Sequence, residues 1–162
     1  MAKYFTISEF IESEEAKKRG IDNTPSQWQI DNCNEMMDTL LDPLREAWAE
    51  ECKAQGYGTP ALDVSSGIRS EALNKAVGGS ETSAHYVGYA ADLIPYNGKL
   101  KKFKRFCYNW LKGVAFDQMI SEDESADGTP SWVHIGYKRR DGSQRKQFLS
   151  NVGNKYMPIS KV

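Results

Sequence analysis

A single carboxylate, Asp92, stands in the middle of an otherwise apolar segment and limits how this chain can fold. Residues 89–94 are typical of a short strand, in which Ala91 and Leu93 share one face and Asp92 points to the other. A buried carboxylate needs a charged partner or a metal ion, or else it stays protonated. The rest of the fold therefore has to supply one of these environments beside the strand.

The chain has two histidines, and both are candidates for that environment. His85 lies seven residues before Asp92, in a predicted loop rich in glycine. His134 lies in a second predicted strand, between two aliphatic residues whose side chains leave on the opposite face. If the two strands are neighbours, Asp92 and His134 face the same side of the sheet.

Two imidazoles and one carboxylate are ligand types that suit zinc. Three protein ligands leave one position for a water molecule, which is the arrangement of a catalytic rather than a structural zinc site. We therefore predict a zinc site formed by His85, Asp92 and His134. For His134 taken alone, an ordinary packed histidine is the alternative.

Length and composition indicate one domain, residues 1–162, with an ordinary globular balance of apolar and charged residues. The formal net charge of −1 predicts no general attraction to nucleic acid or to an anionic membrane. No apolar run approaches the roughly 20 residues that span a bilayer, and residues 1–5 lack the apolar core of a secretory signal. We expect a monomer that is cytoplasmic as synthesised, with no nucleic-acid or membrane partner.

Helix signals are concentrated in the first third of the chain. Thr6-Ile7-Ser8-Glu9 is typical of a capping box and predicts a short helix to about Arg19. Thr24-Pro25-Ser26-Gln27 predicts a second helix start, with proline at the first helical position. Apolar residues then recur at three- and four-residue steps, which predicts an amphipathic helix to about Ala54. Pro43 should kink or divide that helix.

Strand patterns dominate the later part of the chain. The predicted strands are residues 62–65, 89–94, 116–122 and 132–137, and the predicted helices among them are residues 71–76 and 100–110. Arg140-Asp141-Gly142-Ser143 is typical of a hairpin-like turn. Helices early and strands late predict the α+β class with a small, mainly antiparallel sheet backed by helices. The widely spaced Cys33, Cys52 and Cys107 are interpreted as reduced core residues.

The block at residues 66–80, SGIRSEALNKAVGGS, is followed by Ser83-x-His85-x-x-Gly88-x-Ala90-x-Asp92. Together they resemble the core of the zinc D-Ala-D-Ala carboxypeptidase family, which includes the L-alanyl-D-glutamate endopeptidases of phage lysins. Phe116-Asp117-Gln118-Met119-Ile120-x-Glu122 and Trp132-Val133-His134-Ile135 are similar to later motifs of one branch of that family. Residues 5–10 and 20–25 resemble its N-terminal segment, so the resemblance covers roughly residues 4–138.

The resemblance implies a fold shared with the Hedgehog signalling domain and peptidoglycan stem peptides as substrates. It also implies His85, Asp92 and His134 as Zn²⁺ ligands, and action on the cell wall after phage-mediated release. Arg69 matches the family arginine that contacts a substrate carboxylate or the polarised carbonyl, which a fixed guanidinium can stabilise. A surface arginine near a helix start is the alternative, and Ser83 either hydrogen-bonds near the metal or only shapes the loop.

The chain departs from many relatives at the general base. The position three residues before the last histidine, where they carry an acid, is Ser131, which cannot act as a base near neutral pH. Glu122 is the best remaining carboxylate, because it ends a predicted strand and matches a glutamate in the most similar branch. A base must reach the water and have a suitably raised pKa. The rivals of Glu122 are Asp117, Asp123 and Glu124, and a solvated loop acid is the alternative.

Two hypotheses follow. The first is a zinc metallopeptidase that cleaves peptidoglycan peptides, with Glu122 and Arg69 as catalytic residues. The second, motivated by Ser131, is a zinc-containing binding module of the same fold in which catalysis is weak or lost. A separate basic patch surrounds the turn and can contact anionic wall polymers or nucleic acid, although a solvated hairpin is favoured. It consists of Lys138, Arg139, Arg140, Arg145 and Lys146.

Overall fold

The computed structural model describes residues 2–162. These residues contain one sheet of six strands. The strands are β1 (Leu62–Ser66), β2 (Ala90–Pro95), β3 (Gln118–Glu122), β4 (Trp132–Gly136), β5 (Gln147–Val152) and β6 (Lys155–Pro158). Their order across the sheet is β1-β2-β4-β3-β5-β6. Neighbours run antiparallel except β3 and β5, which are parallel. The predicted α+β class with a mainly antiparallel sheet is confirmed.

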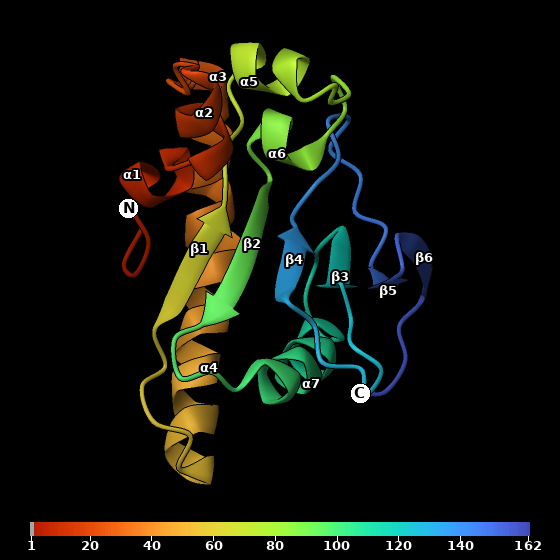
Figure 1. Cartoon of the computed structure of the whole chain (residues 1–162). Coiled ribbons are helices and arrows are strands. Elements are labelled where there is room, and N and C mark those ends of the chain that lie inside the picture. The colour runs from red at the N-terminus through yellow and green to blue at the C-terminus, as the bar shows by residue number, and fades with distance from the viewer. Residues whose placement is uncertain (1) are drawn as a thin grey trace.

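The helices of the described residues surround one side and one end of this sheet. They are α1 (Ile7–Ile11), α2 (Glu14–Arg19), α3 (Gln27–Met36), the π-helical η1 (Met37–Leu41), α4 (Asp42–Gln55), α5 (Glu71–Ala76), α6 (Ala84–Val87) and α7 (Leu100–Leu111). In Figure 1, α4 lies behind β1 and β2, α7 lies at the lower end of the sheet, and α5 and α6 lie at its upper end. None of the helices between residues 2 and 162 combines the length and apolar character needed to cross a membrane.

The N-terminal helices differ in their boundaries from those that the sequence predicts. Thr6 caps α1 as expected, but Ser13 caps a separate helix α2, so the predicted helix is divided in two. The next capping box is formed by Ser26 and Gln29 rather than by Thr24. Helix α3 therefore begins two residues later than the pattern predicts, because the serine hydroxyl receives the orphan backbone N–H there.

The long helix predicted to about Ala54 is present, with a change of geometry where Pro43 enters it. Helices α3 and α4 are joined without a break by η1, and Pro43 occupies the first turn of α4. A π-helical turn is a usual response where the i→i−4 hydrogen-bond pattern is interrupted. The predicted apolar stripe is buried, including Leu40, Leu44 and Trp48 at 0% exposure.

The two faces of the sheet have different surroundings. Ala91 and Leu93 on β2, with Val133 and Ile135 on β4, are fully buried and belong to the main hydrophobic core with residues of α4 and α7. Alternation along each strand sends the intervening residues to the opposite face. That opposite face carries Asp92 and His134, as predicted.

The C-terminal hairpin is absent from the sequence-based prediction. Strands β5 and β6 are joined by Gly153 and Asn154, whose φ angles of +56° and +64° are typical of a two-residue hairpin turn. The predicted turn at residues 140–143 also forms, with Arg139 N–H donating to Ser143 O at 2.9 Å. It is not a β-hairpin, however, because the strands on either side of it, β4 and β5, do not pair.

The three cysteines are buried and free, which confirms their interpretation as reduced core residues. Burial raises the pKa of Cys33 to about 12, and burial also raises the pKa of Cys107 well above its usual value. These two thiols therefore stay protonated and behave as small apolar side chains.

Candidate metal centre

Asp92 and His134 face each other across two adjacent strands. They are directly paired in the antiparallel register of β2 and β4, and Asp92 Oδ1 lies 2.9 Å from His134 Nδ1. Both side chains are nearly buried, at 12% and 9% exposure. The adjacency that the sequence left open is therefore present, and it places two of the three predicted ligands side by side.

His85 reaches the same place from α6, a single helical turn rather than the predicted loop. Its Nε2 lies 3.4 Å from Asp92 Oδ2, and its Nδ1 donates to the carbonyl oxygen of Gly67 at 2.7 Å. The hydrogen bond to a backbone carbonyl fixes the tautomer and leaves Nε2 free to bind a metal. The imidazole is thus oriented toward the carboxylate by its own main-chain partner.

Helix α3 holds both α6 and the segment before α5 in position. Gln29 is buried and its Nε2 donates to the carbonyl oxygens of Arg69 and Tyr86, at 2.7 and 2.6 Å. Asn32 donates to the carbonyl oxygen of Val87 at 2.9 Å. The bonds to Tyr86 and Val87 satisfy backbone acceptors that the short helix α6 leaves without an intrahelical partner, and the bond to Arg69 ties the segment before α5 to the same helix α3. The position of His85 therefore depends on residues more than fifty positions earlier.

Two glycines permit the close packing behind the site. A Cβ on Gly67 would lie 2.6 Å from the Phe10 Cα atom. Gly88 ends α6 with a φ of +92°, and a Cβ there would lie 2.7 Å from the Gln29 carbonyl oxygen. Only glycine combines this left-handed backbone with so close an approach.

The geometry of the three side chains fits a zinc ion. One ligand atom from each of His85, Asp92 and His134 lies within 4.8 Å of the others. Ligand atoms on a tetrahedral zinc are separated by about 3.3 Å, given metal–ligand bonds of about 2.0–2.1 Å. The 3.4 Å and 2.9 Å separations from Asp92 to the two imidazoles are close to that value. The donor set and its spacing therefore suit this metal.

The electrostatics of the cluster favour an ionised carboxylate. Burial alone would raise the pKa of Asp92, but His85 and His134 hold it below its usual range. Burial alone would lower the pKa of His85, whereas the charge of Asp92 and the bonds to Asp92 and Gly67 raise it. In the metal-free protein the cluster stabilises a carboxylate beside a protonated imidazole, and a metal ion would take the place of that proton.

A cavity of about 490 Å³ opens at this cluster. Its lining consists of Ser83, Ala84, His85, Gln118, Ile120, Glu122, His134, Leu149 and Tyr156. Glu122 is 8% exposed and accepts a hydrogen bond from Asn151 Nδ2 at 3.0 Å. It is therefore not a solvated loop acid, and it shares the cavity with both histidines.

The three rival acids are engaged elsewhere. Asp117 forms a bidentate ion pair with Arg145, with both N–O distances at 2.9 Å. Glu124 pairs with the fully buried Lys104 at 2.8 Å. Asp123 is exposed and accepts from Ser131 Oγ at 3.1 Å, so the residue at the position of the missing acid also lies outside the cavity lining.

Arg69 lies close to the cavity without forming part of its lining. Its Nη2 donates to Ser83 Oγ, and Ser83 does line the cavity. Its Nε is buried without a hydrogen-bond partner among the described residues. Burial lowers the pKa of Arg69, and the nearby Asp92 carboxylate opposes that shift. The structure thus connects Arg69 to the site through Ser83.

Two lining residues were missed by sequence reasoning, because both come from the C-terminal hairpin. Leu149 lies on β5, and Tyr156 lies on β6 with 59% of its surface exposed. Burial and the charges of Glu122 and Asp92 raise the pKa of Tyr156, in keeping with its place at the cavity. Gly153-Asn154, with Phe148-Leu149 before it and Tyr156-Met157 after it, is the hairpin signal that would have revealed them.

Comparison with known proteins gives one family. A family model described as Peptidase M15 matches residues 3–135, which is most of the chain. The matched segment contains Arg69, Glu122 and the three candidate ligand residues, and it ends before β5 and β6. No curated protein matches the chain.

Proposed function

This chain belongs to the M15 peptidase family, whose members are zinc metallopeptidases, and we propose that its substrates are the stem peptides of peptidoglycan. The reaction is hydrolysis of a peptide bond, either at a terminal D-alanine or between L-alanine and the D-glutamyl residue. The similarity of residues 66–92 to peptidases of these two types supports the proposal. Such a substrate implies that the protein acts at the cell wall.

We propose that His85 through Nε2, Asp92 through its carboxylate and His134 through Nδ1 bind the zinc ion. The bond from His85 Nδ1 to Gly67 and the orientation of His134 Nδ1 toward Asp92 support this choice of atoms. When bound by these three residues, a zinc ion would act as a Lewis acid and would lower the pKa of a water molecule at the site.

Glu122 is the proposed general base. Its carboxylate accepts a proton from the attacking water and returns that proton to the leaving amine. The observation that carries this role is the shared cavity, since Glu122 is the acidic side chain that lines it together with His85 and His134. Burial at 8% exposure keeps the carboxylate out of bulk water, where a base would be less effective.

Arg69 is proposed to stabilise negative charge on the substrate. Its hydrogen bond to Ser83 keeps the guanidinium beside the cavity, within electrostatic reach of Asp92. A fixed guanidinium can hold a substrate carboxylate or the oxygen that becomes negative during attack on the carbonyl.

The test is a digest of purified muropeptides by the zinc-loaded protein, with the products identified by mass spectrometry. Loss of a terminal D-alanine would establish a carboxypeptidase, and a cut after L-alanine would establish an endopeptidase. Asp92→Asn is the inactive control. Asp63→Asn is the matched control, because Asp63 is an exposed aspartate on the neighbouring strand β1.

Absence of cleavage by protein that contains zinc would contradict the proposed substrate. It would favour the binding module, for which the serine at position 131 is the motivating feature. Binding of the same muropeptides without turnover would then identify that second function.

A further inference from the structure

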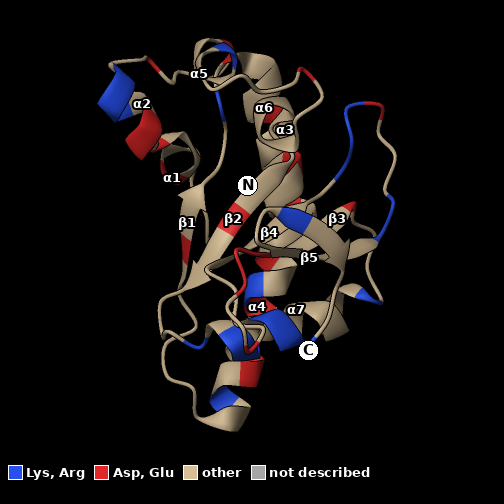
Figure 2. Cartoon of the chain, turned by 45° about the vertical axis from the view of Figure 1, so that its right-hand side comes forward, with Lys and Arg blue, Asp and Glu red and all other residues tan. Residues whose placement is uncertain are grey.

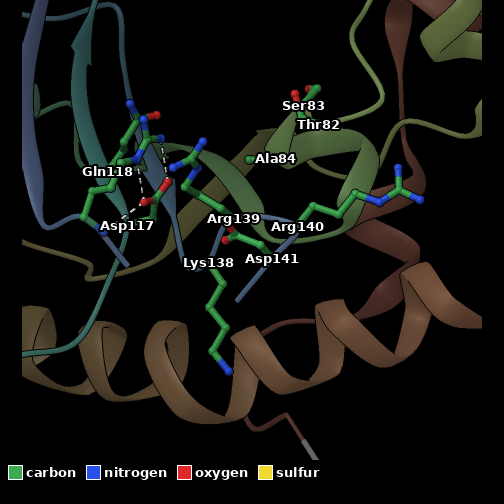
Figure 3. A pocket seen from close by; sticks show the side chains of 10 residues that line it. Thr82, Ser83, Ala84, Asp117, Gln118, Lys138, Arg139, Arg140 and Asp141 are labelled. Atoms are coloured by element: carbon green, nitrogen blue, oxygen red, sulfur yellow. Dashed lines mark hydrogen bonds and ion pairs between the residues drawn. The ribbon is translucent and has the colours of Figure 1, made fainter. Parts of the chain in front are cut away.

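A second cavity, of about 570 Å³, adjoins the cavity at the metal centre. The two cavities share Ser83, Ala84 and Gln118 in their linings. Figure 3 shows the second cavity between the segment of Thr82, Ser83 and Ala84 and the segment of Lys138 to Asp141. A substrate bound at the metal centre can therefore extend into it without leaving the surface.

The second cavity is lined by four cations and two carboxylates. They are Lys138, Arg139, Arg140 and Arg145, with Asp117 and Asp141. Figure 2 shows the same excess of basic over acidic residues in the long loop between β4 and β5, where blue segments flank a short red one. An excess of positive charge in a concave surface attracts anions. Lys138, Arg139, Arg140 and Arg145 of the predicted basic patch therefore line this cavity, whereas Lys146 does not, and all of the patch except Lys138 is exposed.

Three of the four cations are already engaged. Arg145 forms the ion pair with Asp117, and Lys138 Nζ lies 2.7 Å from Glu35 Oε2. Arg140 donates to the Glu81 carbonyl oxygen at 2.9 Å and lies 5.0 Å from the centre of the Trp28 ring. These contacts hold the loop against α3 and the segment before α6, so the cavity has fixed walls.

Arg139 differs from its neighbours, because no group in residues 2–162 forms a hydrogen bond or ion pair with its guanidinium. In Figure 3 its side chain lies between those of Asp117 and Ala84. The carboxylates near it are occupied, Asp117 by Arg145 and Asp141 by the backbone and hydroxyl of Ser143. Arg139 is thus a cation in the cavity to which no anion among residues 2–162 is bonded.

We propose that this cavity is a subsite for a free carboxylate of the substrate, held by Arg139, so that acidic peptides are the preferred substrate class. The inference rests on the proposed function, because a peptide cleaved at the metal centre would pass through the shared lining residues. A guanidinium has the planar donor geometry that a carboxylate matches with two hydrogen bonds. Residues 138–145 lie beyond the segment that the family model matches.

The test measures binding rather than turnover. Isothermal titration calorimetry compares the peptide L-Ala-γ-D-Glu-L-Lys-D-Ala-D-Ala with analogues in which one carboxylate at a time is a carboxamide. The protein is the zinc-loaded Glu122→Gln variant, which keeps the peptide intact. In the parent protein, which carries Glu122→Gln and keeps Arg139, one of the carboxamide analogues should bind about fivefold more weakly than the acidic peptide. Fivefold is the upper end for an exposed ion pair. In Arg139→Gln, the acidic peptide and that analogue should bind equally.

Arg105→Gln is the matched control, because Arg105 is an exposed arginine on α7 whose cavity shares no residue with the other two. It should retain the preference for the carboxylate. Equal binding of all the peptides to the parent, or an unchanged preference in Arg139→Gln, would overturn the subsite.

Poly(glycerol phosphate) is titrated in parallel. If Arg139→Gln weakens binding of this polymer but leaves the affinity for the peptides unchanged, the cavity is a site for a wall polymer. That outcome would also overturn the peptide subsite. Muropeptide cleavage by the wild-type protein is measured separately. Failure of the subsite with intact cleavage is therefore distinguishable from failure of the proposed function.

Discussion

Asp92 on β2 and His134 on β4 are direct cross-strand partners, with 2.9 Å between Oδ1 and Nδ1. This pairing makes the metal centre depend on strand register. A slip of one residue would send Asp92 into the core and bring Leu93 to the open face. The buried residues on either side of the pair, Ala91, Leu93, Val133 and Ile135, oppose such a slip because they would lose their place in the core.

Glu122→Gln should abolish most turnover while zinc stays bound. The amide keeps the shape of the side chain and can still contact Asn151, but it cannot accept a proton from water. We expect kcat to fall by about 10²–10⁴-fold, the usual range for loss of a general base. Steady-state kinetics and zinc content by atomic spectroscopy are the measurements. Asp123→Asn, at the exposed neighbouring acid, is the control, and unchanged kcat in Glu122→Gln would remove Glu122 from the mechanism.

Zinc affinity should fall as the pH falls. Burial lowers the pKa of His85, but Asp92 and the other polar contacts raise it overall, so zinc must displace a proton from this imidazole. Below that raised pKa the apparent affinity should fall by about tenfold per pH unit for this one proton. Competition with a chelator at several pH values measures the slope, with the known protonation of the chelator subtracted. An affinity independent of pH between 5 and 7, values around the ordinary histidine pKa of about 6.5, would contradict the assignment.

In the metal-free protein, the free energy of unfolding should depend on pH through His85 and Asp92. The raised pKa of His85 contributes stability below the ordinary histidine pKa, and that contribution is lost as the pH rises through the raised value. The lowered pKa of Asp92 contributes stability above the ordinary aspartate pKa, and that contribution is lost as the pH falls. The free energy of unfolding from this pair should therefore be greatest between the two ordinary values, as urea denaturation with and without Asp92→Asn can measure.

Gly67→Ala should weaken zinc binding as well as the fold. The new Cβ would lie 2.6 Å from Phe10 Cα, so the backbone at residue 67 must move. The carbonyl oxygen of residue 67 accepts the hydrogen bond from His85 Nδ1, so this movement also changes the position of a proposed metal ligand. We expect a loss of about 1–3 kcal/mol in the free energy of unfolding, as for other overpacked sites. Gly113→Ala is the control, because a Cβ there meets no atom within 4 Å. Thermal unfolding with and without zinc separates the two effects, and equal behaviour of the two variants would contradict the prediction.

Lys104→Met should destabilise the protein without changing kcat. Lys104 Nζ donates to Glu124 Oε1 and to the carbonyl oxygens of Gly128 and Ser160, at 2.8, 2.9 and 2.7 Å. Its removal leaves the Glu124 carboxylate, 2% exposed, without its cation, at a cost of about 3–5 kcal/mol. Urea denaturation measures this loss. The double variant Lys104→Met/Glu124→Gln should recover part of it, and failure to do so would mean that the charge of Glu124 is not the cause.

Alternation along the strands was sufficient to place Asp92 and His134 on one face, since a period of two applies wherever one face is buried. The adjacency of their strands could not be predicted, because it is set by pairing across more than forty residues. The turn that carries His85 is held by Gln29 and Asn32, long-range contacts that leave no local pattern in the sequence.

The choice among the candidate acids also depends on long-range contacts that leave no local pattern in the sequence. Glu122 and Glu124 are two residues apart near the end of one predicted strand, and Glu122 is favoured in the sequence only by its place at the strand end and by the family resemblance. Their partners come from distant elements, Asn151 for Glu122 and Lys104 for Glu124. One acid therefore lines the cavity, while the other is neutralised in the interior.

The parallel pairing of β5 with β3 attaches the C-terminal hairpin to the sheet beyond the segment that holds the metal ligands. The proposed metal ligands lie within residues 85–134, whereas Leu149 and Tyr156 of the hairpin line the cavity. One part of the cavity wall is thus encoded beyond the stretch of chain that holds the proposed metal ligands. Because Asn151 on β5 also donates to Glu122, a different hairpin grafted after β4 should alter selectivity and should keep the reaction only where it supplies a similar donor to Glu122.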